Sequence, residues 1–446
     1  MPEALAVDLL ISARWVIPIR PANTVLEHYS LAITGDRITA LLPTAEALQQ
    51  FQPRQHVELR DHVLMPGLIN MHGHAAMTLF RGLADDLPLM TWLQEHIWPA
   101  EARWVNDEFA EDGVTLAIAE MLLGGTTCFS DMYFFPDATA RIASKYQMRT
   151  QICFPVLDFP TNWARDAADY IHKGLKLHDT YRDSQYVFTA FGPHAPYTVS
   201  DGPIKEVVTL AAQLDIPVQI HLHETAFEVS EAEKASGKRP IRRLYELGLL
   251  TESTQCVHMT QISEEDLALL QETKAHVVHC PESNLKLASG FCPVDKLLKN
   301  GVNVCIGTDG AASNNDLDLL GEVRTAALLA KAVSGNAAAL NAFEALEMAT
   351  INGAQAMGLA DRLGSLEAGK WADVIAIDLS GLETQPVYHP ASQIVYATPA
   401  QRVTHSWIGG KLKLDNRRLV NIDIQAVRDK AARWAARIQS PEAQAD

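Results

Sequence analysis

Three features of the 446-residue sequence predict an α/β protein, a (β/α)8 TIM barrel with a small β-sandwich domain built from both chain ends. Eight short runs rich in Val, Ile, Phe and Cys alternate with longer segments of helical pattern, as in right-handed β-α-β units. Polar residues collect at the carboxyl end of nearly every run, where barrel enzymes place their chemistry. Strand-like segments with a similar residue pattern precede the first run and follow the last helix. We expect residues 66–363 to form the barrel, and residues 1–65 and 364–446, with the C-terminal helix and tail, to form the β-sandwich domain.

The composition excludes several classes of protein. Lys and Arg number 37 against 54 Asp and Glu, and the resulting net charge of −17 repels nucleic acids and anionic lipids. The longest apolar run, residues 114–123, is interrupted by Glu120 and is too short to span a bilayer. Glu3 and Asp8 stand where a signal peptide needs positive charge, and the six scattered cysteines form no C-x-x-C pair. We therefore expect a cytoplasmic protein with reduced cysteines that binds neither nucleic acid nor membrane.

The segments outside the barrel carry strand and turn signals. In YSLAITGDRITAL (29–41), the ITGDR sequence predicts a tight turn between two strands. Further strand-like segments are DLLISARWVIPI (8–19), GKWADVIAIDL (369–379), THSWIGGKLKL (404–414) and RRLVNIDI (417–424).

The eight barrel runs follow in order along the chain. Eight parallel strands linked by helical crossovers favour a closed barrel, so their polar carboxyl ends should share one mouth. The runs are residues 67–74, 125–133, 149–158, 186–196, 217–224, 254–259, 275–284 and 302–310.

Four residues at these strand ends could hold a metal ion. His72 and His74 flank Gly73, and the two-residue period of a strand points both imidazoles to one side. His221 ends the fifth strand, and Asp309 ends the eighth, which neighbours the first in a closed barrel. Three imidazoles and one carboxylate suit Zn²⁺ with a water completing the site. The third and fourth runs contain no Lys or Glu to bridge two metals, so we predict one zinc per chain.

Three groups could move protons around this site: Glu224, His258 and Asp309 itself. A carboxylate beside an activated water can accept its proton and later pass it to a leaving group, and Glu224 and Asp309 could divide those roles. His223 and His279 are expected to be structural, His223 because it should face the opposite side of the strand from His221.

Taken together, five motifs resemble the amidohydrolase superfamily over essentially the whole chain: MPGLINMHGH, QIHLHE, CVHM, HCPESN and GTDGAASNN. The segments LPLMTWLQEHIWPAEARW and FGPHAPYT resemble the branch of 5′-methylthioadenosine and S-adenosylhomocysteine deaminases, which is close to the s-triazine hydrolases. The resemblance implies a homo-oligomeric zinc aminohydrolase with metal ligands His72, His74, His221 and Asp309, and with catalytic groups Glu224, His258 and Asp309. In the implied mechanism, Glu224 protonates N1 of an adenine nucleoside, His258 stabilises the attacking oxygen, and Asp309 passes a water proton to the departing amine.

The resemblance also implies how the substrate is bound. Glu101 accepts hydrogen bonds from the ribose 2′ and 3′ hydroxyls, His194 and Ser313 contact the purine, and Trp92 forms a wall of the pocket, where Glu224 and Asp309 also contact the substrate. A carboxylate is a natural acceptor for a vicinal diol. Arg165 is the only basic residue of FPTNWARDAADY (159–170), so a partner for a homocysteine carboxylate is hard to find. This favours 5′-methylthioadenosine over S-adenosylhomocysteine, with adenosine as a further candidate.

Two alternatives remain at this point. A related enzyme acting on another ring, such as guanine or an s-triazine, would use the same metal site with a different pocket. A non-catalytic barrel is the other alternative, but such a protein should have lost a proton-transfer group, and all of them are present.

Overall fold

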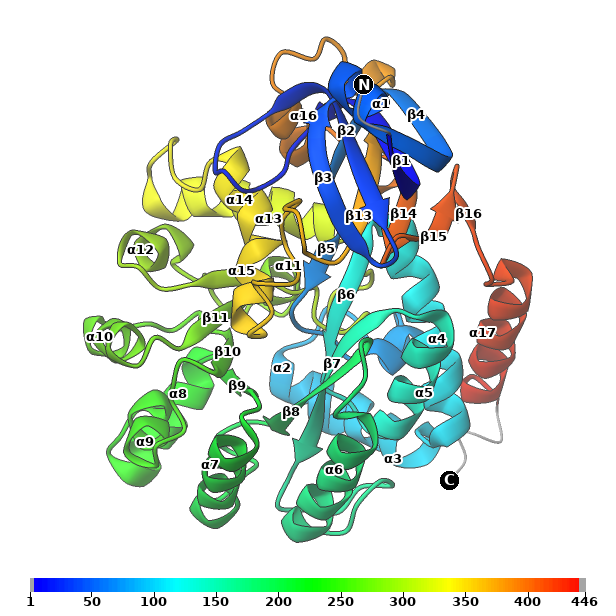
Figure 1. The fold of residues 1–446 in the computed structure, drawn as a ribbon. Helices are drawn as coiled ribbons and strands as arrows, with labels where there is room; N and C mark the ends of the chain where they lie inside the picture. Colours follow the sequence, from blue (N-terminus) through cyan, green and yellow to red (C-terminus); the bar gives the residue numbers. More distant parts are fainter. Residues whose placement is uncertain (1–3, 441–446) are drawn as a thin grey trace.

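The computed structural model describes residues 4–440 and contains two eight-stranded sheets (Figure 1). One sheet is parallel and follows the order of the eight predicted runs. Each strand lies within one of those runs, and almost every residue of these strands is buried, as expected for a parallel sheet covered on both faces. Its strands are β5 (Leu68–Asn70), β6 (Thr126–Asp131), β7 (Arg149–Val156), β8 (Val187–Pro193), β9 (Val218–Leu222), β10 (Thr254–His258), β11 (His276–His279) and β12 (Val304–Ile306).

Backbone hydrogen bonds bring the first and last strands of this sheet together. The Met71 amide donates to Ile306 O at 2.9 Å, and the Asp309 amide donates to His72 O at 3.0 Å. The sheet is thus a barrel, which confirms the predicted fold class, and it sets the residues that follow β5 beside those that follow β12.

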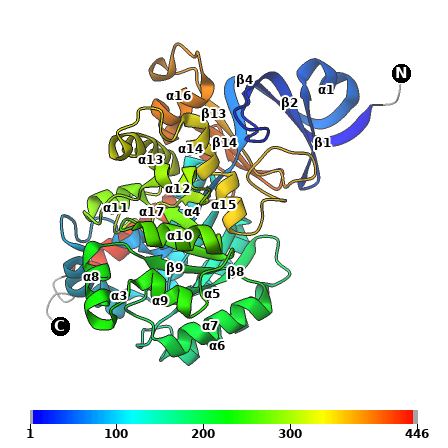
Figure 2. The same ribbon diagram turned by 90° about the vertical axis from the view of Figure 1, so that its left-hand side faces the viewer.

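The crossover helices lie outside the strands, as Figures 1 and 2 show for α5, α6, α7, α9 and α10. The helices of the first half of the chain are α1 (Thr44–Gln50), the 3-10 helix η1 (Ala75–Phe80), α2 (Leu89–Thr91), the π-helical η2 (Trp92–Ile97), α3 (Trp98–Trp104), α4 (Asp107–Gly124), α5 (Pro136–Tyr146), α6 (Ala167–Tyr181) and α7 (Asp201–Leu214). Those of the second half are α8 (Ala226–Ser236), α9 (Pro240–Glu246), α10 (Glu264–Thr273), α11 (Pro281–Lys286), α12 (Val294–Lys299), α13 (Leu319–Ser334), α14 (Ala342–Met348), α15 (Ile351–Ala356), η3 (Leu382–Thr384), α16 (Pro390–Tyr396), η4 (Ala400–Arg402) and α17 (Ile424–Ile438).

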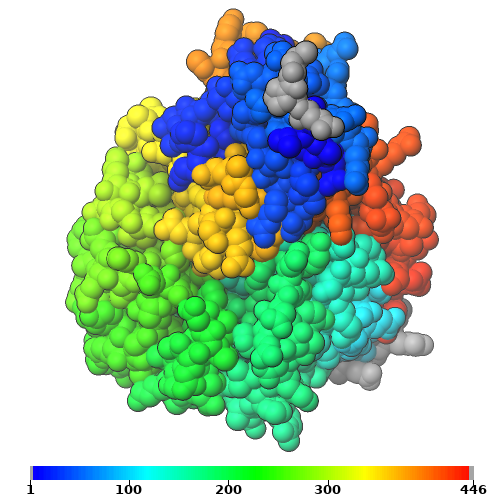
Figure 3. All heavy atoms as spheres, in the orientation of Figure 1, coloured from blue at the N-terminus to red at the C-terminus, as the bar shows by residue number. Residues whose placement is uncertain are grey.

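The second sheet joins the two ends of the chain, in the order β16-β15-β14-β13-β4-β1-β2-β3. Met65 of β4 pairs with Ile375 of β13 in antiparallel register, and Figure 3 shows N-terminal and C-terminal segments side by side. The predicted turn between β2 and β3 is present, and Gly35 there has a φ of 61°, which glycine adopts without a steric penalty. The strands are β1 (Leu5–Val16), β2 (Leu26–Thr34), β3 (Arg37–Pro43), β4 (Phe51–Pro66), β13 (Val374–Asp378), β14 (Val403–Ile408), β15 (Lys411–Asp415) and β16 (Arg418–Leu419).

A buried ion pair connects the barrel to this second sheet. Arg149, the first residue of β7, donates from Nε to Asp373 Oδ2 at 2.7 Å and from Nη2 to Oδ1 at 3.0 Å. Its guanidinium also lies 3.9 Å from the ring centroid of Trp371. Both charged side chains are almost fully buried and shielded from water. The charge of each is therefore balanced by the charge of the other.

The C-terminal helix α17 packs against the barrel helix α4. Trp434 Nε1 donates to Asp112 Oδ2 at 3.1 Å, and the Trp434 ring meets Phe109 edge-on. The predicted domain boundaries at 65/66 and 363/364 stay a prediction, and the tail after residue 440 lies outside the described residues.

The structure also describes the state of the cysteines and the character of the helices. The six cysteines are buried with free thiols. Within residues 4–440, no helix has both the length and the apolar character required to cross a bilayer.

Candidate metal centre and active site

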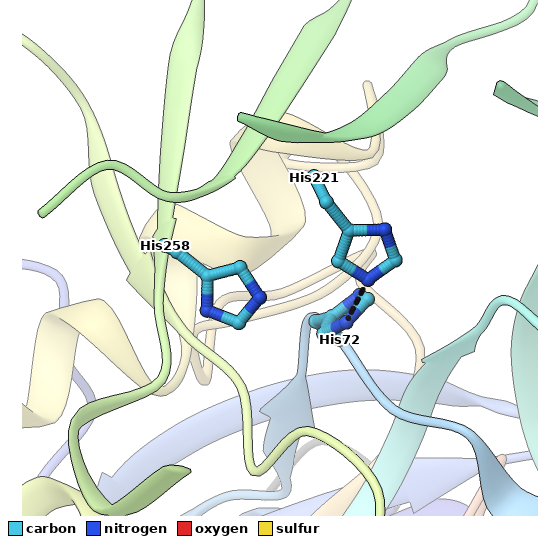
Figure 4. A group of neighbouring side chains, drawn as sticks. All are labelled: His72, His221 and His258. Carbon is cyan, nitrogen blue, oxygen red and sulfur yellow. Dashed lines mark hydrogen bonds between the residues drawn. The ribbon is translucent and has the colours of Figure 1, made fainter. Parts of the chain in front are cut away.

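Three imidazoles and a carboxylate meet at the mouth of the barrel. Nε2 of His221 lies 3.2 Å from Nε2 of His72, and a dashed line joins the two rings in Figure 4. Oδ1 of Asp309 lies 3.4 Å from Nε2 of His72 and 3.2 Å from Nε2 of His74. The structure therefore brings together all four predicted metal ligands.

The outward nitrogen of each of these imidazoles is bound to a carbonyl-type oxygen. Since such an oxygen only accepts hydrogen bonds, each Nδ1 carries a proton, which leaves Nε2 as the nitrogen that can bind a metal. The bonds run from His72 to Gln219 Oε1 (2.8 Å), from His74 to Met132 O (2.6 Å) and from His221 to His194 O (2.7 Å). Gln219 is itself oriented, because its Nε2 donates to Met71 O at 2.9 Å. The three Nε2 atoms converge beside a carboxylate, and this donor set suits Zn²⁺.

Burial and charge set the protonation states that metal binding requires. Burial lowers the pKa of His72 and, more strongly, that of His221, so that both rings are neutral. Burial by itself would raise the pKa of Asp309, but His72 and His74 outweigh it and hold that pKa well below its usual range. Burial by itself would lower the pKa of His74, but the adjacent Asp309 carboxylate outweighs it and raises that pKa to about 9. Metals bind the ionised carboxylate and the neutral imidazole, so a metal that enters this site displaces a proton from His74.

Asp309 is fixed by its own loop and by Ser283 of α11. It has a φ of 63°, and its Oδ1 accepts the Gly310 amide at 2.8 Å. The buried hydroxyl of Ser283 donates to Oδ2 at 2.7 Å and also lies 3.2 Å from Ser313 Oγ. Both oxygens of Asp309 are therefore held in place.

Glu224 and His258 lie on the adjacent side of the mouth. Glu224 follows β9, His258 ends β10, and their Oε2 and Nε2 atoms are 3.7 Å apart. His258 Nδ1 is 2.9 Å from Asn284 Oδ1, which leaves Nε2 facing the site. Burial, and secondly the charge of Asp309, raise the pKa of Glu224 to about 8. A carboxyl group with this pKa is protonated at neutral pH and can donate a proton.

His258 also lies close enough to His72 and His221 for the three rings to form a second possible ligand group (Figure 4). The alternative group is His72, His74 and Asp309. The predicted ligand set adds His221 to the group of His72, His74 and Asp309. It leaves His258 free for proton transfer.

A cavity of about 650 Å³ opens beside these groups. The four residues expected to bind substrate, Trp92, Glu101, His194 and Ser313, all line it. Trp92 begins η2 and donates from Nε1 to Ala84 O at 3.1 Å, and Glu101 lies further along the chain on α3. Burial raises the pKa of Glu101 to about 7.

The rest of the cavity wall is mainly apolar, with Trp98, Leu157 and Phe159 among its residues. Among the residues that the structure describes, no Lys or Arg lines the cavity. Arg165 is exposed and pairs with Asp169 at 3.3 Å, so it does not contribute a charge to the wall. The cavity thus suits a ligand with an uncharged tail.

His223 lies away from the site, as expected, but for a different reason. Strand alternation would put His221 and His223 on the same side, so alternation does not separate them. Instead β9 ends at Leu222 and His223 has a φ of 53°, which turns its ring outward. There Nδ1 donates to Gln261 O at 3.0 Å and Nε2 accepts the Ile241 amide at 3.2 Å. His279 is buried and is not among the candidate ligands.

Three residues around the centre were not identified from the sequence: Gln219, Ser283 and Asn284. Gln219 lies two residues before His221 on the same face of β9, and this period-2 spacing was a usable signal. Ser283 and Asn284 lie in the HCPESN motif, but no local pattern indicates which strand-end residue each of them contacts.

Comparison with known proteins identifies the family of the chain. The sequence pattern of the amidohydrolase family matches residues 63–413. A 5-methylthioadenosine/S-adenosylhomocysteine deaminase of Saccharophagus degradans is 55% identical over 443 residues, 99% of each chain. The crystal structure of an adenosine deaminase from Xanthomonas campestris with bound zinc has a TM-score of 0.97 and 50% identity, covering 98% of this chain and 100% of that one. Atrazine chlorohydrolase from Arthrobacter aurescens, at 24% identity and a TM-score of 0.88 over 96% of this chain and 99% of that one, shares the fold.

Proposed function

Because the chain belongs to the amidohydrolase family, we propose that it is a zinc-dependent aminohydrolase that removes the 6-amino group of an adenine nucleoside as ammonia. The preferred substrate is 5′-methylthioadenosine, with adenosine and S-adenosylhomocysteine as weaker alternatives. The observation that carries the proposal is the meeting of three imidazole nitrogens and Asp309 beside a cavity that is also lined by Glu224. One zinc per chain, held by His72, His74, His221 and Asp309, supplies Lewis-acid activation of water when bound.

The protein side chains handle the protons. Glu224, with its raised pKa, donates a proton to N1 of the purine, which makes C6 more electrophilic. Asp309 accepts a proton from the attacking water and passes it to the departing amine. His258 presents Nε2 to the attacking oxygen. Because Nδ1 already donates its proton to Asn284 Oδ1, Nε2 donates to the attacking oxygen only when the ring carries a second proton.

The cavity supports the substrate assignment. Glu101 accepts hydrogen bonds from the two ribose hydroxyls, His194 and Ser313 contact the purine, and Trp92 covers it. Among the described residues, the apolar wall contains no Lys or Arg. It suits a methylthio group better than a charged homocysteine tail, which would lose its hydration there without gaining an oppositely charged partner for its carboxylate.

The remaining parts of the proposal concern the setting of the enzyme. We propose a cytoplasmic homo-oligomer that acts on a small-molecule nucleoside. The net charge of −17 supports the absence of nucleic acid as a partner.

Ammonia release tests the proposal directly. The purified zinc enzyme is assayed with 5′-methylthioadenosine, adenosine, S-adenosylhomocysteine, guanine, cytosine and an s-triazine. We expect the highest kcat/KM with 5′-methylthioadenosine. A higher value with guanine or the s-triazine would replace the nucleoside assignment by the related-ring alternative.

A further inference from the structure

Glu228 binds the backbone of the residue that is proposed to donate the proton. Its Oε1 accepts the His223 amide at 3.0 Å, and its Oε2 accepts the Glu224 amide at 2.8 Å. One carboxylate therefore spans two successive peptide N–H groups in the turn between β9 and α8.

The start of α8 explains how this side chain reaches the turn. Thr225 is the N-cap of α8, and its hydroxyl accepts the Glu228 amide at 3.2 Å. In a usual capping box, the acidic side chain three residues after the cap returns to the N-cap amide. Here the Glu228 side chain reaches past the cap to the two residues before it. A carboxylate at a helix N-terminus is also favoured by the helix dipole.

The same turn is fixed from its other side by Thr260, in the segment that follows β10. Thr260 Oγ1 donates to Glu224 O at 2.7 Å, and the Thr260 amide donates to His223 O at 3.0 Å. The amide and the carbonyl of Glu224 thus both have fixed partners, which leaves its side chain as the part that faces the cavity.

We propose that Glu228 is a positioning residue for proton transfer: by holding the two amides, it sets where the Glu224 carboxyl meets the substrate. This inference rests on the proposed acid role of Glu224. A displacement of about 1 Å in a reacting group can cost on the order of 100-fold in rate, so a defect in this turn should reduce turnover rather than ground-state binding.

The first experiment compares Glu228→Gln with Glu231→Gln. The first change replaces one accepting oxygen by an NH2 group that cannot accept an amide proton, whereas Glu231 lies exposed on the same helix and pairs with Lys234 at 2.6 Å. We expect Glu228→Gln to lower kcat at least tenfold, with KM within about twofold, zinc content unchanged and Tm close to that of the wild type. Glu231→Gln should leave kcat unchanged. A wild-type kcat in Glu228→Gln would overturn the proposal.

A double-mutant cycle separates positioning from a general structural role. If Glu228 acts through Glu224, adding Glu228→Gln to Glu224→Gln should lower kcat no further than Glu224→Gln alone. Fully additive losses would refute the positioning role. Unchanged activity in Glu224→Gln would instead refute the proposed function of Glu224, so the two failures are distinguishable.

Thr260→Val provides a second variant in case Glu228→Gln folds poorly. It keeps the shape of the side chain and removes the hydroxyl that donates to Glu224 O. The same signature is expected: a lower kcat, retained zinc and no additional loss in the Glu224→Gln background. Loss of zinc in Thr260→Val, with KM and kcat equally affected, would contradict positioning.

Discussion

The Nε2 atoms of His72 and His221 face each other at 3.2 Å, although the proton of each ring is on the opposite nitrogen. Two lone pairs at this distance repel each other. This repulsion destabilises the folded barrel, and a bound cation removes it. Metal binding should therefore favour the folded state.

Zinc removal should destabilise the protein. At a free zinc concentration of 100 times Kd, binding adds about 2.7 kcal/mol to the free energy of unfolding. Thermal unfolding measured after chelation, and again after zinc is restored, should show a reversible drop in Tm, with elemental analysis giving about one zinc per chain. Asp309→Ala should show neither the zinc nor the shift. Two tightly bound metals would contradict the single-metal site.

Gln219→Leu should weaken zinc binding about 10- to 100-fold, because it removes the oxygen that orients the His72 ring and fixes its tautomer. Competition with a chelator of known affinity measures the change. Gln271→Leu, on the exposed surface of α10, is the matched control and should bind zinc normally. Equal affinity in the two variants would mean that packing alone orients His72.

The use of the ribose hydroxyls should depend on pH through Glu101. A carboxyl group whose pKa is raised to about 7 is neutral below that pH and then accepts hydrogen bonds poorly. The ratio of kcat/KM for 5′-methylthioadenosine to that for its 2′,3′-dideoxy analogue should therefore rise as the pH increases through about 7. Taking this ratio cancels titrations that affect both substrates equally. In Glu101→Gln the ratio should be independent of pH, and a wild-type profile there would remove Glu101 from ribose binding.

Removing one partner of the Arg149–Asp373 pair should destabilise the fold strongly. Arg149→Met leaves the Asp373 carboxylate buried without its counter-charge, at a cost of about 3–5 kcal/mol. Denaturant unfolding measures it, and Arg149→Met combined with Asp373→Asn should recover part of the loss. Arg141→Met breaks the exposed pair with Asp107 and should cost at most about 1 kcal/mol. Similar losses in the two single variants would show that burial does not matter here.

The sequence predicted the barrel, and the proximity of the four candidate metal ligands, because both follow from a rule of topology. Parallel strands place their carboxyl ends at one mouth, so His72 and Asp309 could be predicted as neighbours although they lie on the first and last strands. The hydrogen bond between Gln219 and His72 spans 147 positions of the chain, and no comparable rule connects its two side chains.

The position of His223 illustrates a second limit. Its ring direction depends on where β9 ends and on one positive φ angle, and neither can be derived from the alternation of residues. Glu228 was missed for a related reason, since its target is two backbone amides and leaves no signature in side-chain type.

The pairing of β4 with β13 has a consequence for synthesis of the chain on the ribosome. After β4 has emerged, its partner edge is not made until about 300 residues later, which at roughly 5–20 residues per second takes roughly 15–60 s. During that interval Val63, Leu64 and Met65, which are buried in the finished protein, present an open and apolar strand edge. A nascent chain that stalls before Val374 keeps this edge open. The open edge is then available to pair with the same edge of another nascent chain nearby.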